Sequence, residues 1–160
     1  MKQTTCRKLL YTISFLFIAI CVKSQVLVIG PSLHYNMGGG DKKFSWGVEI
    51  SYWQWEDFYY DFTPLGIDIG IEFEKSKTRI YSELQAGLGY GASAGYVYEF
   101  GKDFNGGGFQ GSVWGAYYGG IDVRYRRINN TNYFSPGSFA KVPLYARTPS
   151  MNMNIFGNMI

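Results

Sequence analysis

The chain has 160 residues, of which 46% are hydrophobic and 19% aromatic, with 21 glycines and only 2 cysteines. Its formal charge of +3 depends on residues 1–24, which hold four of the fifteen Lys and Arg residues, both cysteines and no acid. The rest of the chain is therefore close to neutral. Its composition excludes a disulfide or a cysteine metal site and argues against binding to nucleic acid.

Residues 1–24 have the features of a secretory signal peptide. Basic residues precede an apolar run over 9–22, and the small residue Ser24 comes just before Gln25. The run is shorter than the about 20 residues that a transmembrane helix needs. We expect cleavage near Ser24-Gln25 and one exported domain over residues 25–160.

The remaining chain alternates apolar and polar residues with the two-residue period of a β-strand, and no segment shows the 3.6-residue period of a helix. In chain order, strands are predicted over residues 26–36, 44–55, 65–75, 79–90, 92–100, 109–118 and 121–127. Turns or loops are predicted at 37–43, 76–78, Gly91, 102–107, 119–120 and 129–137. An eighth strand is expected over 138–147, with 151–155 as a rival, so the end of the domain over 138–160 is left open.

The stretch 65–74 shows the alternation most clearly. Its odd positions are Leu65, Ile67, Ile69, Ile71 and Phe73, whereas its even positions hold only glycine, aspartate and glutamate. A soluble barrel would turn the apolar row inward, and a membrane barrel would turn it outward to lipid.

Three observations favour the membrane barrel. The polar rows are rich in glycine, acid and serine and almost lack lysine, which suits the narrow lumen of an eight-stranded barrel better than a sheet facing water. Aromatic residues lie toward strand ends, where interfacial girdles place them. Several runs also have the about 9–11 residues needed to cross a bilayer at a tilt.

We therefore predict an all-β fold, an antiparallel up-and-down transmembrane β-barrel of about eight strands with a polar, glycine- and acid-rich lumen. The predicted lipid-facing residues are Leu27, Ile29, Val48, Ile50, Ile67, Ile69, Ile71, Leu84, Leu88 and Val123. The predicted interface aromatics are Tyr35, Phe44, Trp46, Tyr52, Tyr90 and Tyr98. The predicted lumen network consists of His34, Glu49, Asp68, Glu72, Glu83, Glu99, Asp122, Arg124 and Arg126.

Arg124 is the predicted hub of this network, because it lies mid-strand and one guanidinium can serve two carboxylates. Its candidate partners are Glu49, Asp68, Glu72 and Glu83. The excess of acids over arginines could also hold a cation. No cofactor or metal site is expected.

The pattern over residues 26–127 resembles the small eight-stranded outer-membrane barrels of the OmpA/OmpX type. The resemblance implies a location in the outer membrane, with outer-membrane lipid and, during biogenesis, the barrel-assembly machinery as partners. We expect a monomer. The chain departs from the pattern at its end, which reads Phe156-Gly157-Asn158-Met159-Ile160 and lacks a terminal aromatic residue.

The function that these features favour is a structural or envelope-interaction role without catalysis. One alternative is a membrane-embedded hydrolase of the lipid A deacylase kind, with Ser32, His34 and Glu49 as its catalytic set. The other is a soluble periplasmic barrel whose apolar rows line a cavity for an apolar ligand. Trp53 and Trp55 are expected in an interfacial belt.

Overall fold

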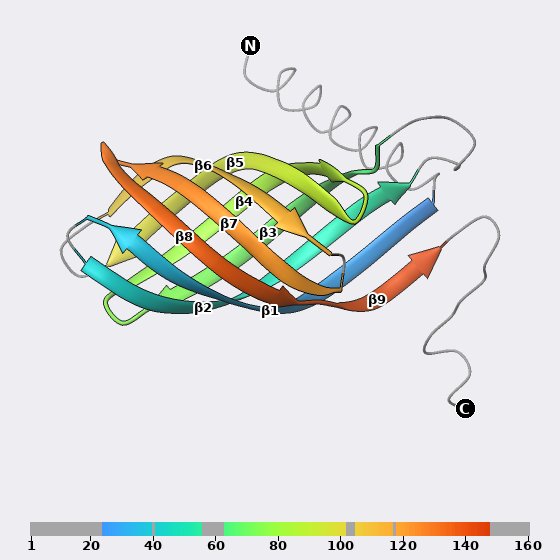
Figure 1. The fold of residues 1–160 in the computed structure, drawn as a ribbon, viewed down its shortest axis with the longest axis horizontal. Coiled ribbons are helices and arrows are strands. Elements are labelled where there is room, and N and C mark those ends of the chain that lie inside the picture. The colour runs from blue at the N-terminus through green and yellow to red at the C-terminus, as the bar shows by residue number, and fades with distance from the viewer. Residues whose placement is uncertain (1–23, 40, 56–62, 102–104, 117, 148–160) are drawn as a thin grey trace, which may run out of the picture.

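The computed structural model describes residues 24–39, 41–55, 63–101, 105–116 and 118–147. Within these residues the chain forms nine β-strands (Figure 1). They are β1 (Ser24–Gly38), β2 (Asp41–Trp55), β3 (Leu65–Glu74), β4 (Lys77–Gly87), β5 (Tyr90–Gly101), β6 (Asn105–Gly115), β7 (Gly119–Ile128), β8 (Thr131–Ala140) and β9 (Val142–Arg147). The described part of the chain contains no helix long and apolar enough to cross a membrane.

The strands close into a barrel. Each strand from β1 to β8 pairs antiparallel with the next, and the free edge of β1 pairs with β8 over residues 32–38 and with β9 over residues 25–29. β9 continues β8 along the edge of β1, so the two together form the eighth strand of the barrel (Figure 1). Closure removes the unpaired edges that an open sheet would present.

The eighth strand begins earlier than the sequence predicted. Residues 131–137 were expected to form a loop, but they belong to β8, and the connection from β7 is only Asn129-Asn130. Both asparagines have positive φ, +44° and +65°, as a two-residue type I′ hairpin turn requires. The polar stretch therefore contains a tight turn and then a strand. The rival segment 151–155 lies outside the described residues.

Three glycine-rich segments were also assigned wrongly. Residues 105–107 begin β6 instead of completing a loop, residues 119–120 begin β7, and the chain reverses between β4 and β5 at residues 88–89 instead of Gly91. A Cβ at Gly107 would collide with the Tyr96 hydroxyl, and one at Gly108 with the Arg127 carbonyl. These glycines serve close cross-strand packing, whereas Gly89, with a φ of +75°, occupies the actual turn.

The apolar rows face outward. All the predicted lipid-facing residues and interface aromatics lie on the outer surface of the barrel, exposed or half-buried. Ile69, at the middle of β3, is 54% exposed, and Leu84 on β4 is 70% exposed. Since the apolar rows do not line a cavity, the expectation attached to the soluble-barrel alternative is wrong.

The interior has a small hydrophobic cluster toward each end. Tyr81, Val97, Ile128 and Tyr133 pack together toward the end where β7 turns into β8. Val26, Val28 and Trp53 pack with Trp114 toward the end where β1 begins. Trp53 is buried inside the barrel, so its assignment to an outer belt is wrong. The side chain of Trp55 lies outside the described residues. Polar side chains fill the space between the two clusters.

Candidate functional site

The predicted lumen residues all lie inside the barrel, where each is at most 4% exposed. The two-residue period of the strands accounts for this placement, since every second side chain of a barrel strand points inward. We call these residues, together with Arg79 and Lys141, the interior network. They come from β1, β2, β3, β4, β5 and β7, with Lys141 between β8 and β9.

Glu72 on β3 is the centre of the interior network. Arg126 on β7 forms an ion pair with its carboxylate, and Arg79 on β4 donates to its Oε1 over 3.2 Å. The Ser45 hydroxyl donates to the same oxygen over 2.5 Å, and the Asn36 amide over 3.4 Å. One carboxylate thus joins four other strands of the barrel.

Arg79 extends the network toward the end of the barrel where β3 turns into β4. Its Nε lies 2.7 Å from Glu99 Oε2, and its Nη2 lies 3.0 Å from Glu74 Oε2. Lys77, in turn, lies 3.1 Å from Glu99 Oε1. At this end each buried carboxylate therefore has a cation within ion-pair distance, which offsets the cost of removing it from water.

Arg124 bridges two carboxylates, as predicted. It forms an ion pair with Glu49 on β2, and its Nε donates to Asp122 Oδ2 over 2.6 Å. Its guanidinium also lies over the Tyr81 ring, 4.8 Å from the ring centroid, and the Tyr81 hydroxyl donates to Glu49 over 2.6 Å. The bridging role is present, but the centre of the network is Glu72, which binds Arg126 and Arg79 instead.

Lys141 is an interior cation that the sequence analysis missed. Its Nζ lies 2.9 Å from Glu49 Oε2 and 3.4 Å from Asp68 Oδ2, and it donates to the Ser51 hydroxyl over 2.8 Å. It lies between β8 and β9, close to Gly30, where a Cβ would collide with the Ala140 carbonyl. The signal was available in the expected strand over 138–147, where Phe139 and Lys141 face inward and Ser138, Ala140 and Val142 face outward.

The predicted catalytic set of Ser32, His34 and Glu49 is not assembled. His34 Nε2 lies 2.9 Å from Asp122 Oδ2, so the acid that orients this imidazole is Asp122. Glu49 is engaged by Arg124, and the Ser32 hydroxyl has no hydrogen-bond partner within the described residues. All three side chains also point into the interior, away from the outer wall that lipid could reach.

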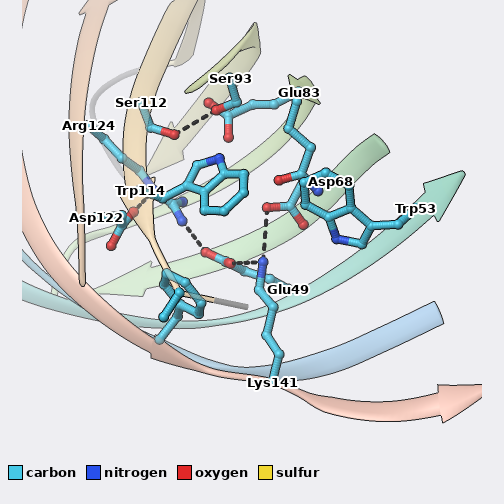
Figure 2. Close-up of a pocket in the computed structure, with 13 residues that line it drawn as sticks. Glu49, Trp53, Asp68, Glu83, Ser93, Ser112, Trp114, Asp122, Arg124 and Lys141 are labelled. Carbon is cyan, nitrogen blue, oxygen red and sulfur yellow. Dashed lines mark hydrogen bonds and ion pairs between the residues drawn. The ribbon is translucent and has the colours of Figure 1, made fainter. Parts of the chain in front are cut away.

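A small pocket opens in the half of the barrel where β1 begins. The side chains around it include Trp53, Trp114, Asp68, Glu83, Arg124 and Lys141 (Figure 2). The Lys141 ammonium and the Arg124 guanidinium both point toward Glu49, on one side of the pocket. Among the described residues, no group of three or more His, Cys, Asp or Glu side chains is arranged to hold a metal ion.

The structure thus defines an all-β, closed, antiparallel eight-stranded barrel with a charged interior and an apolar exterior, as the sequence predicted. This is the architecture of small transmembrane β-barrels, the fold class to which the OmpA/OmpX resemblance pointed.

Searches with the sequence found no family model that matches the chain. They also found no curated protein that matches it.

Among solved structures, a de novo designed transmembrane β-barrel is 14% identical, with 73% of this chain and 95% of that chain covered and a TM-score of 0.45. Ail, the attachment invasion locus protein of Yersinia pestis, is 12% identical, with 75% and 99% covered and a TM-score of 0.35. A structure of Ail in complex with the heparin analogue sucrose octasulfate is 11% identical, with 76% and 100% covered and a TM-score of 0.33. These values are too low to support an inference about function.

Proposed function

We propose that the protein is an outer-membrane β-barrel with a structural or envelope-interaction role and no catalytic activity. The observation that carries the proposal is the inverted distribution of side chains. Leu84 and Ile69 on the outer wall are more than half exposed, whereas Arg126 and Glu72 inside are at most 1% exposed. Water would favour the opposite arrangement, but the hydrocarbon core of a bilayer favours this one.

A belt of aromatic residues supports the same proposal. It lies on the outer wall over β1, β2, β3, β5 and β6, toward the end where β1 turns into β2. Tyr35 packs on Phe44 and Trp46 on Phe73, each with ring centroids 4.8 Å apart. Tyr98 with Phe100, and Tyr96 with Phe109, continue the belt over β5 and β6. Aromatic side chains gather at the two membrane–water interfaces of transmembrane barrels, so this belt marks one boundary of the proposed apolar band.

The filled interior favours a structural role over transport. Arg126, Arg79, Tyr81, Glu49 and Glu72 occupy the middle of the barrel, and all are at most 2% exposed. The side chains in the middle of the barrel close its narrow interior, so we expect no continuous water-filled path and no ion conductance. Several connections are only two residues long, including 75–76, 88–89 and 129–130. They offer few side chains for contacts with a distant partner.

Cell fractionation tests the proposal. The full chain, expressed in a Gram-negative host, should appear in the outer-membrane fraction and resist extraction by alkaline carbonate. Its apparent mass on a gel should shift on heating, as the folded barrel denatures. A matched form that lacks residues 1–24 should stay in the cytoplasm, because it has no export signal. Recovery of the full chain in the soluble periplasmic fraction would refute the membrane assignment.

A further inference from the structure

Two carboxylates face each other inside the barrel, on neighbouring strands. Asp68 on β3 and Glu83 on β4 are directly opposite in the antiparallel register, and both are at most 4% exposed. Side chains so placed have Cβ atoms about 4.5–5.5 Å apart, and two like charges there are destabilising. The other neighbour of Glu83 across the sheet is Gly95, which has no side chain to offer it. We call Asp68 and Glu83 the carboxylate pair.

Only one member of the carboxylate pair is satisfied by the protein. Asp68 accepts from Ser51 over 2.9 Å and lies 3.4 Å from the Lys141 ammonium. Glu83 has no ion pair or hydrogen bond among the described residues, and its Oε1 is buried. A buried carboxylate without a partner is costly. Arg124 attracts Glu83 from across the pocket, but no group among the described residues donates a hydrogen bond to Glu83 Oε1. A small cation beside Glu83 would supply that donor.

Two hydrogen-bond donors near Glu83 indicate which other chemical group the bound cation would have. Gln85 lies two residues beyond Glu83 on the same face of β4, about 6–7 Å along the strand, and its buried Nε2 has no acceptor within the described residues. Arg124 Nη1, across the pocket, also has no acceptor in the part of the chain that the structure describes. A group that accepts hydrogen bonds, a short distance from the cation, would satisfy these donors.

Aromatic side chains complete the pocket. The rings of Trp53 and Trp114 meet edge to face, with centroids 5.5 Å apart, and both line the same space as Glu83 (Figure 2). The face of an indole attracts an organic cation within about 6 Å. Ala116, at the margin of the pocket, is exposed and lies toward the barrel end where β1 begins.

We propose that this pocket binds a small organic ammonium compound that carries a hydroxyl or carboxylate group two or three bonds from its nitrogen. The ammonium binds between Glu83 and the indole rings, and the hydroxyl or carboxylate accepts from Gln85. The site does not depend on the proposed location of the barrel. It can fail while the protein remains an outer-membrane barrel, and the reverse also holds.

Titration calorimetry on the full-length barrel, purified in detergent micelles, tests the site with ethanolamine as the probe. Saturable binding is expected for ethanolamine, weaker binding for propylamine, and none for propanol or propionate. Glu83→Gln should weaken ethanolamine binding at least tenfold. Glu74→Gln is the matched control, because Glu74 lies at the opposite end of the barrel and pairs with Arg79, and it should leave binding unchanged.

A second measurement separates a binding role from a structural one. Glu83→Gln preserves the shape of the side chain but removes the unpaired charge, so the ligand-free variant should unfold at a denaturant concentration equal to or above that of the wild type. Ethanolamine should raise the unfolding midpoint of the wild type and leave that of the variant unchanged. The proposal is overturned if ethanolamine does not bind, if Glu83→Gln binds it equally well, or if K⁺ or Ca²⁺ occupies the site in preference to it.

Discussion

Replacement of Glu72 by Gln should be among the most damaging single changes to the interior. The variant keeps the shape of the side chain but removes the only carboxylate that pairs with Arg126 among the described residues. Arg126 would keep hydrogen bonds to Gln110, at 2.8 Å, and to Asn36, at 3.2 Å, but would have no counter-charge while fully buried. Arg79 would keep Glu99 and Glu74. The damage should therefore act mainly through Arg126.

The expected loss in the free energy of unfolding depends on which buried charges lose their partners. Removal of one partner of a buried ion pair costs about 3–5 kcal/mol, and Glu72→Gln should fall in this range. Arg124→Met should cost less, about 1.5–3 kcal/mol, which is the value of a hydrogen bond to a charged group. The reason is that Glu49 retains Lys141 and Asp122 retains His34. In the double variant Glu72→Gln with Arg126→Met, part of the loss should be recovered.

The assay is urea unfolding of the barrel refolded into lipid vesicles, followed by tryptophan fluorescence and by the heat-dependent gel shift. Glu74→Gln serves as the control, because Glu74 lies at the barrel end and its partner Arg79 keeps Glu72 and Glu99. If Glu72→Gln is no more destabilising than Glu74→Gln, Glu72 is not the centre of the network. An absence of coupling between Glu72→Gln and Arg126→Met would show that their ion pair does not form.

Three further outcomes are expected. Ile69→Arg, at mid-strand on the outer wall, should cost about 2–4 kcal/mol in vesicles, as Arg does at the bilayer midplane; wild-type stability would mean that this face does not meet lipid. Gly70→Ala should cost about 1–3 kcal/mol by overpacking, because its Cβ would enter the Tyr81 ring, and the double variant with Tyr81→Ala should show strong coupling in the same assay. Ser32→Ala should leave the lipid A of expressing cells unchanged by mass spectrometry, and a Ser32-dependent loss of an acyl chain would restore the hydrolase alternative.

The alternation of the sequence was sufficient to predict the class of fold and the face on which most side chains lie. Between residues 65 and 74 the odd residues are outside and the even residues inside, as their apolar and charged character indicated. Backbone geometry makes successive side chains of a strand point to opposite faces. Once a segment is known to be a strand, the face of each side chain follows from whether its residue number is odd or even.

Strand boundaries were harder to predict where glycine and asparagine are frequent. Asn129-Asn130 forms a complete turn, and Gly106 to Gly108 lie within a strand, although both segments have the composition of a loop. A glycine can serve a turn through its φ or a strand through its lack of a Cβ, and composition does not distinguish the two uses. Lys141 lay within the expected eighth strand over 138–147, but its side chain was not assigned to a face of that strand, so this cation of the interior network was missed.

Only the tertiary structure decided which interior charges meet. Glu72 pairs with Arg126, 54 residues away, and His34 pairs with Asp122, 88 residues away. Glu83, a predicted partner of Arg124, forms no hydrogen bond or ion pair with it among the described residues. The odd–even alternation places all these groups inside. It does not give their height along the barrel axis or the strand that each side chain contacts. Those quantities depend on the tilt and stagger of the closed sheet, which arise when β1 pairs with β8 and β9.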